Sequence, residues 1–135
     1  MSARYLLDTN IASDLVRNPN GKVAAAIARI GAARVATSIV VVAEMRFGAA
    51  KEGSARLAQQ IETILTELPV LPLEPPADMF YAKARLALEA AGTPIGANDL
   101  LIAAQALAGN MIVVTDNVRE FSRVPGLKIE NWLRP

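Results

Sequence analysis

Short apolar runs alternate with longer segments of helical periodicity along the whole chain. The apolar runs have the length and composition of buried β-strands. They occupy residues 4–7, 34–37, 70–73, 111–114 and 127–130. Strands that alternate with helices predict an α/β fold with a central parallel sheet. We therefore expect four to five short parallel strands flanked by helices.

The segments between these runs repeat apolar residues every three or four positions, which is typical of amphipathic helices. The clearest of them is residues 54–68, where Leu57, Ile61 and Ile64 share one face. Thr9 or Asn10 is expected to cap the first helix, and Asn98 is expected to cap the helix that follows it. The other helices are expected over residues 11–17, 23–30, 39–50, 76–91 and 99–107. No repeat or linker divides the chain, so residues 1–135 are predicted to form one domain.

The composition removes many kinds of chemistry. The 135 residues are 53% hydrophobic and include no His and no Cys. Imidazole catalysis, disulfides, zinc clusters and thiol nucleophiles are therefore excluded. No stretch has the pattern of a secretion signal or a membrane span, so a soluble, cytoplasmic protein is expected. Carboxylates remain as the main candidate metal ligands, and they select hard cations, chiefly Mg²⁺ or Mn²⁺.

Four acidic residues are isolated in apolar sequence: Asp8, Glu44, Asp99 and Asp116. Burying a charge is costly unless the charge is paired or binds a metal. Three of the four lie near a strand end or in the first turn of the next helix. Because the carboxyl ends of parallel strands meet at one edge, the four acids are expected to converge at one cleft.

Each acid also has a simpler interpretation. Asp8 would cap the following helix, and Asp99 would complement a helix dipole. Asp116 and Asn117 would form an Asx-turn, and Glu44 would lie on a solvated helix face. If the acids do converge, their mutual repulsion favours binding of one or two Mg²⁺ ions. That arrangement is suited to metal-assisted phosphodiester hydrolysis, which needs no His.

The charge balance favours an anionic substrate. The chain has 14 Lys and Arg against 13 Asp and Glu. Without the four isolated acids, 14 basic residues face 9 acids, which leaves a charge of +5. Arginine suits bidentate contacts with phosphate, although each basic residue could equally be ordinary solubilising surface. The residues expected to contact an RNA backbone are Arg17, Lys22, Arg46, Lys51, Arg119 and Arg123.

Four blocks of sequence resemble PIN-domain ribonucleases, and specifically the VapC toxins of type II toxin–antitoxin pairs. The blocks are residues 7–10, 37–48, 93–104 and 114–121, in family order and across nearly the whole chain. The resemblance implies a compact PIN fold and a Mg²⁺- or Mn²⁺-dependent endoribonuclease, with a transfer RNA as one candidate substrate. It also implies inhibition by a cognate VapB-type antitoxin, homodimerisation, and promoter DNA binding through the antitoxin complex.

The resemblance also assigns roles to residues. Positions matching Asp8, Glu44 and Asp99 bind metal and support catalysis. Thr9, Asn10 and Thr115 would orient them. The family's fourth position matches Asn117, whereas the acid of this chain, Asp116, falls on a variable position. Both residues are kept, Asp116 as the fourth catalytic acid and Asn117 as an orienting residue, and a single-metal site is favoured.

Two other functions are compatible with the same residues. One is a phosphotransfer enzyme in which Asp8 accepts the phosphoryl group. Such enzymes usually carry a second Asp two residues later, where this chain has Asn10. The other is a non-catalytic module whose acids bind a basic partner.

Overall fold

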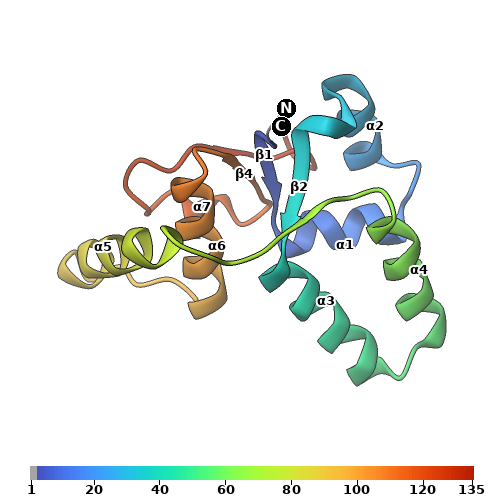
Figure 1. Cartoon of the computed structure of the whole chain (residues 1–135), viewed down its shortest axis with the longest axis horizontal. Helices are drawn as coiled ribbons and strands as arrows, with labels where there is room; N and C mark the ends of the chain where they lie inside the picture. The colour runs from blue at the N-terminus through green and yellow to red at the C-terminus, as the bar shows by residue number, and fades with distance from the viewer. Residues whose placement is uncertain (1–2) are drawn as a thin grey trace.

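A five-stranded parallel sheet forms the centre of the computed structural model, which describes residues 3–135 (Figure 1). The strand order is β3-β2-β1-β4-β5, and all neighbouring pairs are parallel. The predicted α/β fold and parallel sheet are confirmed. The strands are β1 (Tyr5–Leu7), β2 (Val35–Ser38), β3 (Val70–Leu71), β4 (Ile112–Val114) and β5 (Ile129–Glu130).

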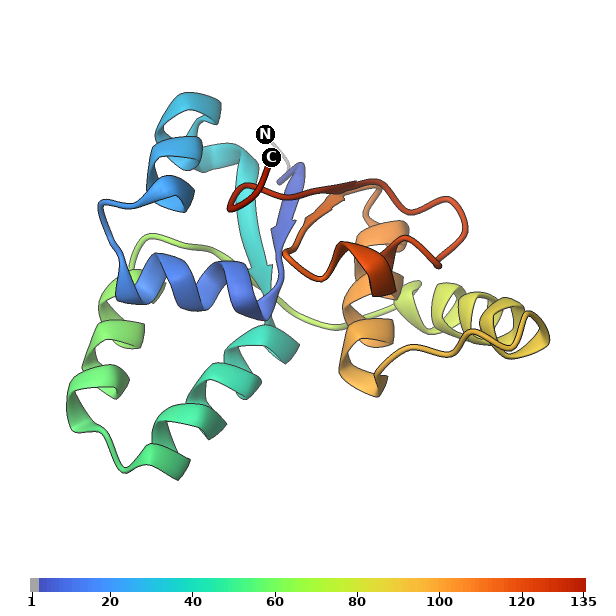
Figure 2. The ribbon, with the colours of Figure 1, turned by 180° about the vertical axis from the view of Figure 1, so that it is seen from behind.

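The helices lie on both sides of this sheet. In Figures 1 and 2, the first four helices gather on one side and the last three on the other. The first group is α1 (Thr9–Arg17), α2 (Lys22–Ile30), α3 (Ile39–Glu52) and α4 (Ala55–Leu65), with a 3₁₀ turn at Ala32–Arg34. The second group is α5 (Ala77–Ala90), α6 (Ala97–Ala108) and α7 (Val118–Phe121). Within residues 3–135, every helix is too short or too polar to cross a lipid bilayer.

The core is built from the strands whose sequences are apolar throughout. Leu6, Leu7, Val113 and Val114 are fully buried. Both of the strands that contain them are interior to the sheet, so alternate side chains need apolar partners on both faces. This is why these runs do not show the polar alternation of a half-exposed strand.

Some helix boundaries differ from the prediction. The first helix begins at Thr9, so Asp8 and not Thr9 or Asn10 precedes it. The helix α6 begins at Ala97 after Gly96, so the predicted cap at Asn98 is wrong. The short helix α7 was not predicted, because four residues are too few to establish a helical period. Apart from the added α7 and the 3₁₀ turn at Ala32–Arg34, the order of elements is as predicted.

The strand order reverses at β1. The chain passes from β1 outward to β2 and β3, and then returns to the other side of β1 for β4 and β5. A reversal of this kind opens a crevice beyond the carboxyl ends of the two central strands, where open α/β sheets bind ligands. Residues that follow β1 and β4 therefore occupy the place in the fold best suited to a site.

Candidate active site

Asp8 lies directly after β1, at the reversal of strand order. Leu7 is paired with Val114 in the sheet, so the residues that follow them, Asp8 and Thr115, are neighbours. The Thr115 hydroxyl donates to Asp8 Oδ2 at 2.7 Å, and the Asp8 amide donates to the Val114 carbonyl at 2.9 Å. The prediction that Thr115 orients an acid is consistent with this contact.

The second carboxylate oxygen of Asp8 has no comparable partner. Asp8 is only 3% exposed. Its Oδ1 atom is buried without a hydrogen-bond partner among residues 3–135. Although Asp8 occupies the position before α1, its side chain makes no capping bond, so the interpretation of Asp8 as a simple helix cap is wrong. A buried, unpaired carboxylate oxygen is costly unless a cation or proton meets it.

Burial raises the pKa of Asp8, and the charges of Glu44 and Glu120 raise it further, against the opposing hydrogen bond from Thr115. The pKa shift is larger at Asp99, which lies in the first turn of α6. Burial, followed by the charges of Asp8 and Glu120, raises the pKa of Asp99 to about 7. These carboxylates therefore lie close enough to repel one another, as the expected convergence requires.

Glu120 belongs to this group, although the sequence analysis did not single it out. Asn117 Nδ2 donates to Glu120 Oε2 at 3.0 Å and lies 3.5 Å from Asp99 Oδ2. The Gly96 amide also donates to Glu120. The hydrogen bond from Asn117 is the main cause of a lowered pKa at Glu120, so Glu120 loses its proton at lower pH than Asp99 does.

Glu44 approaches the group from α3. It is half-buried, and the Thr9 hydroxyl donates to its Oε1 at 2.7 Å. This bond joins the start of α1 to the middle of α3, so Glu44 is not simply on a solvated face. A cleft of about 720 Å³ opens beside it, lined by residues of α3 together with Asn98 and Leu101.

Comparison with known proteins decides the family. The sequence model of the PIN domain matches residues 5–127, which is most of the chain. The chain belongs to the PIN domain family.

The relatives of this PIN domain are VapC proteins. The chain is 34% identical to "Ribonuclease VapC2" of Rickettsia felis over 130 residues, covering 95% of this chain and 97% of the relative. It is 31% identical to "tRNA(fMet)-specific endonuclease VapC" of Salmonella typhimurium, covering 96% and 98%. The predicted kinship with VapC ribonucleases is confirmed.

Solved structures agree with these relatives. The fold is similar to a chain in the crystal structure of VapBC2 from Rickettsia felis bound to a promoter DNA fragment. Its TM-score is 0.88, with 32% identity and coverage of 95% of this chain and 98% of that one. A chain of DNA-bound VapBC from Salmonella typhimurium gives a TM-score of 0.86 with 30% identity, covering 96% and 98%.

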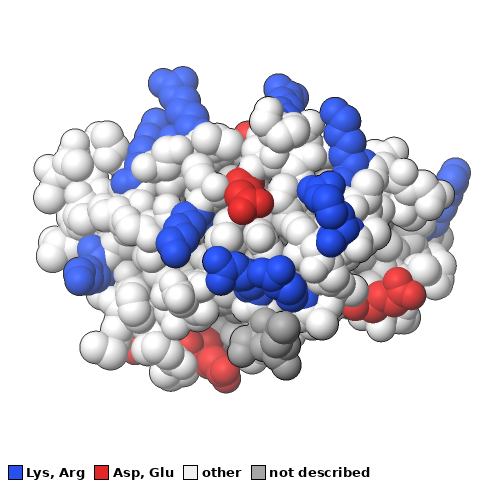
Figure 3. Space-filling view, turned by 90° about the horizontal axis from the view of Figure 1, so that it is seen from above, with Lys and Arg blue, Asp and Glu red and all other residues white. Residues whose placement is uncertain are grey.

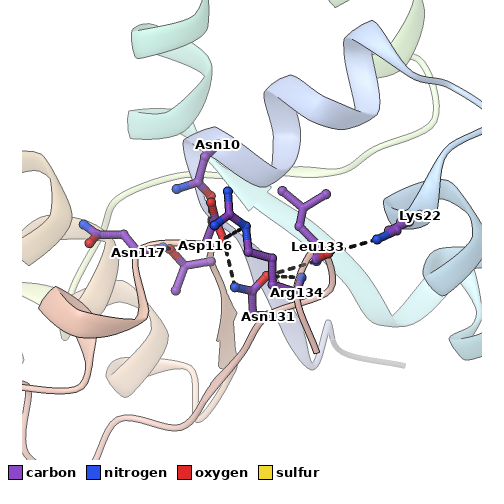
Figure 4. A network of polar contacts seen from close by, with 8 residues as sticks. Asn10, Lys22, Asp116, Asn117, Asn131, Leu133 and Arg134 are labelled. Atoms are coloured by element: carbon purple, nitrogen blue, oxygen red, sulfur yellow. Dashed lines mark hydrogen bonds and ion pairs between the residues drawn. The ribbon is translucent and has the colours of Figure 1, made fainter.

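In this PIN domain, Asp116 lies apart from the other predicted acids. Its Oδ1 accepts from Asn131 Nδ2 at 3.0 Å and lies 3.4 Å from Arg134 Nε (Figure 4). Its amide donates to the Asn10 side chain at 3.1 Å, so Asn10 orients this loop and not an acid of the group. The predicted Asx-turn is wrong, because the Thr115 hydroxyl instead accepts from the Asn117 amide.

The predicted RNA-contacting residues are dispersed. Arg46 forms an ion pair with Glu62, and Arg17 lies 3.9 Å from Glu52. Arg123 donates to the Pro94 carbonyl at 3.1 Å. The remaining three, Lys22, Lys51 and Arg119, are exposed. Of the six, Arg123 is close enough for its charge to lower the pKa of Glu120, and the RNA-contacting roles of all six stay predictions.

A metal ion would have to draw the carboxylates together. Within residues 3–135, no three acidic side chains are grouped closely enough to hold a metal as they stand. The donor set nevertheless fits Mg²⁺ or Mn²⁺, because it consists of hard carboxylate oxygens and one of them, Asp8 Oδ1, is buried without a partner. The raised pKa of Asp99 is a further sign of excess negative charge that a cation would relieve.

Proposed function

We propose that this PIN domain is the toxin of a VapBC pair and a Mg²⁺- or Mn²⁺-dependent endoribonuclease that acts in the cytoplasm. The observation that carries the proposal is the unpaired Asp8 Oδ1 at the reversal of strand order, which shares its electrostatic surroundings with Glu44, Asp99 and Glu120. The names of the relatives, which include a ribonuclease and a tRNA-specific endonuclease, support RNA as the substrate and a transfer RNA as its candidate class.

Asp8 and Asp99 would hold the cation, with Glu44 and Glu120 completing its surroundings. A bound divalent ion lowers the pKa of its water and stabilises charge on a phosphoryl oxygen. Asp116 would act only indirectly, since its carboxylate is already bound by Asn131 and Arg134. This arrangement favours one metal ion over two.

The other polar residues would hold the carboxylates in place. Thr115 fixes Asp8 Oδ2 and so leaves Oδ1 available to the cation. Thr9 fixes Glu44, and Asn117 links Asp99 to Glu120. Because Asp99 retains a proton up to about pH 7 when no cation is present, metal binding would release that proton.

The charge distribution supports an anionic substrate. Figure 3 views the side of the molecule on which the two termini lie in Figure 1, and mostly basic side chains appear there. Arg4, Arg34 and Lys128 come directly before β1, β2 and β5, at the opposite strand ends from the carboxylates. Asp8, Glu44, Asp99 and Glu120 lie at the other strand ends, so without these four acids the chain is more basic than its net charge of +1 suggests.

Partners would include a VapB-type antitoxin, a second copy of this chain, and promoter DNA through the antitoxin complex. The structural neighbours in DNA-bound VapBC complexes support this assembly. Large apolar side chains are also exposed, among them Phe47 at 68%, Met79 at 71% and Leu86 at 73%. Exposed apolar groups of this size suit protein interfaces. An antitoxin arginine entering the carboxylate group would occupy the cation position and inhibit the enzyme.

The decisive experiment is incubation of antitoxin-free protein with total RNA, with Mg²⁺ or with EDTA. We expect cleavage only with Mg²⁺, products with 5′-phosphate ends, and no cleavage by a folded Asp8→Asn variant. Cleavage in EDTA or by Asp8→Asn, or a trapped aspartyl phosphate on Asp8, would contradict the proposal. A synthetic antitoxin peptide should inhibit only when its arginine is present, and equal inhibition without the arginine would reject that mode of inhibition.

A further inference from the structure

A second cleft lies beside the carboxylates and is separate from them. Its volume is about 680 Å³, and it is bounded by the end of α1, the turn before α2 and the C-terminal tail. Asp116 belongs to its wall. Thr115, which precedes Asp116, contacts Asp8, and Asn117, which follows it, contacts Asp99. The cleft therefore adjoins the carboxylate group through Asp116.

The acids in this cleft are already engaged. Asp14 Oδ1 accepts from Asn18 Nδ2 at 2.9 Å. Asp116 Oδ1 faces Asn131 and Arg134, at 3.0 Å and 3.4 Å. Each of these acids thus has a hydrogen-bond partner for one oxygen, whereas Asp8 Oδ1 is buried without one in the part of the chain that the structure describes.

The basic residues of the cleft are only lightly engaged. Arg134 is 80% exposed on its side chain, and its pairing with Asp116 uses Nε. Among the described residues, Lys22 donates only to the neutral carbonyl of Leu133, at 3.4 Å. Arg17 is more than half exposed and lies 3.9 Å from Glu52, a separation at which an exposed ion pair contributes little. With three basic and two acidic residues, the lining is net positive beside a strongly negative group.

Arg134 is presented by an anchored segment, although it is the penultimate residue. Asn131 Oδ1 accepts from the amides of Leu133 and Arg134, at 2.9 Å and 3.0 Å. Trp132 is buried, and its ring lies 5.4 Å from that of Tyr5. Figure 4 shows the resulting row of polar groups, which runs from Asn117 across Asp116 and Arg134 to Lys22.

We infer that this cleft binds a phosphate of the RNA next to the bond that is cut, with Arg134 and Lys22 as its ligands. The inference rests on the proposed ribonuclease function and extends it to how the substrate strand leaves the site. The guanidinium of Arg134 suits a bidentate contact with phosphate oxygens, and the ammonium of Lys22 acts as a point charge. An RNA strand with one phosphate at the carboxylates would continue along the row in Figure 4.

The test measures RNA binding in the Asp8→Asn background, where cutting is not expected to interfere. Lys22→Gln/Arg134→Gln is compared with Lys83→Gln/Arg29→Gln, which makes the same charge change at exposed residues outside the cleft. Each phosphate contact contributes about 0.7 to the slope of log K against log salt for single-stranded RNA. Because Arg134 and Lys22 share one phosphate, we expect a slope shallower by about 0.7 in the cleft variant and unchanged in the control.

Arg134→Lys keeps the positive charge, so it shows whether a loss of binding in the Gln variant comes from the charge or from a loosened C-terminal tail. It should retain the parental salt slope, with the emission of Trp132, the only Trp of the chain, unchanged. In the cutting-competent protein, Lys22→Gln/Arg134→Gln should raise KM and leave kcat within about twofold.

The inference is overturned if the cleft variant matches the control, if Arg134→Lys behaves as the Gln variant does, or if the change appears only with duplex DNA. The proposed function is tested by the parent protein alone: it fails if the parent does not cut RNA in Mg²⁺, independently of the results with the cleft variants.

Discussion

The junctions after β1 and β4 carry similar sequences and have different structures. Asp8 is the first residue after β1, and Asp116 is the second residue after β4. Asp8 is buried with one carboxylate oxygen unpaired, whereas Asp116 is partly exposed and bound by Asn131 and Arg134. Both acids follow apolar strands, so apolar context alone does not separate them.

The difference follows from the alternation of side chains beyond a strand. Thr115 matches Asp8 in register and directs its hydroxyl to it, so the next residue, Asp116, turns the opposite way. Asn117 then turns back and contacts Asp99 and Glu120. Position relative to the strand end, and not isolation in the sequence, decides which acid can serve the active site.

The largest effect should come from removing the carboxylate charge at each of the two junctions in turn. Asp8→Asn removes the buried oxygen proposed to meet the cation, and cleavage should fall by more than about 100-fold, the upper range for losing a residue that only supports a ligand. Asp116→Asn should cost clearly less, because its partners lie in the tail. The measurement is kcat/KM on one RNA with Mg²⁺. Equal losses at both positions would contradict the comparison.

The next effect concerns the residues that link the β4 junction to Asp99. Asn117→Ala and Glu120→Gln should each lower kcat/KM by about 10- to 100-fold, because they disturb the orientation and charge around Asp99. Ser122→Ala is a suitable control, since its hydroxyl donates only to the backbone of the same helix. If Glu120→Gln matched Ser122→Ala in activity, Glu120 would have no part in the site.

A smaller effect is expected at Thr115. Thr115→Val keeps the shape of the side chain and removes the hydroxyl that donates to Asp8 and accepts from the Asn117 amide, which leaves a buried carboxylate without its hydrogen bond. The free energy of unfolding should fall by about 1–3 kcal/mol at pH 8, so the variant is less stable. In the Asp8→Asn background the same change should cost less, because no charge is stranded. Urea unfolding of the four proteins measures this coupling, and additive losses would rule it out.

The smallest effect is a pH dependence of stability set by Asp99. Its folded pKa, about 7, exceeds the unfolded value of 3.8, so the folded state binds the proton more tightly. This favours folding at low pH, and the contribution is lost as the pH rises from about 4 to about 7. Metal-free Asp99→Asn should therefore show a flatter profile of Tm against pH than the parent. Parallel profiles would argue against the crowding of charge at Asp99.

Much of this architecture was predictable from the chain, because apolar runs and helical periods specify elements directly. The acids Asp8, Glu44 and Asp99 were predicted because each is a lone charge among apolar residues. Glu120 did not stand out, because Arg119 and Arg123 flank it in the sequence and give it the pattern of a surface residue. Its contact with Asn117 is local, but its contact with Gly96 joins residues 24 apart in the chain, which no local pattern records.

The C-terminal tail was unpredictable for a related reason. Asn131 and Arg134 reach Asp116 across the sheet edge, and nothing in the sequence of either segment requires the other. The family's fourth position, which takes Asp or Asn, matches Asn117, and that residue contacts Asp99 and Glu120 and not the tail.

The most direct test of a cation site at the β1 junction is Mn²⁺ binding by antitoxin-free protein, followed by the EPR signal of free Mn²⁺ at pH 8. The parent protein should remove Mn²⁺ from solution with a stoichiometry near one ion per chain, and Asp8→Asn should leave it free at the same concentrations. Equal uptake by the two proteins, or none by the parent, would contradict the account.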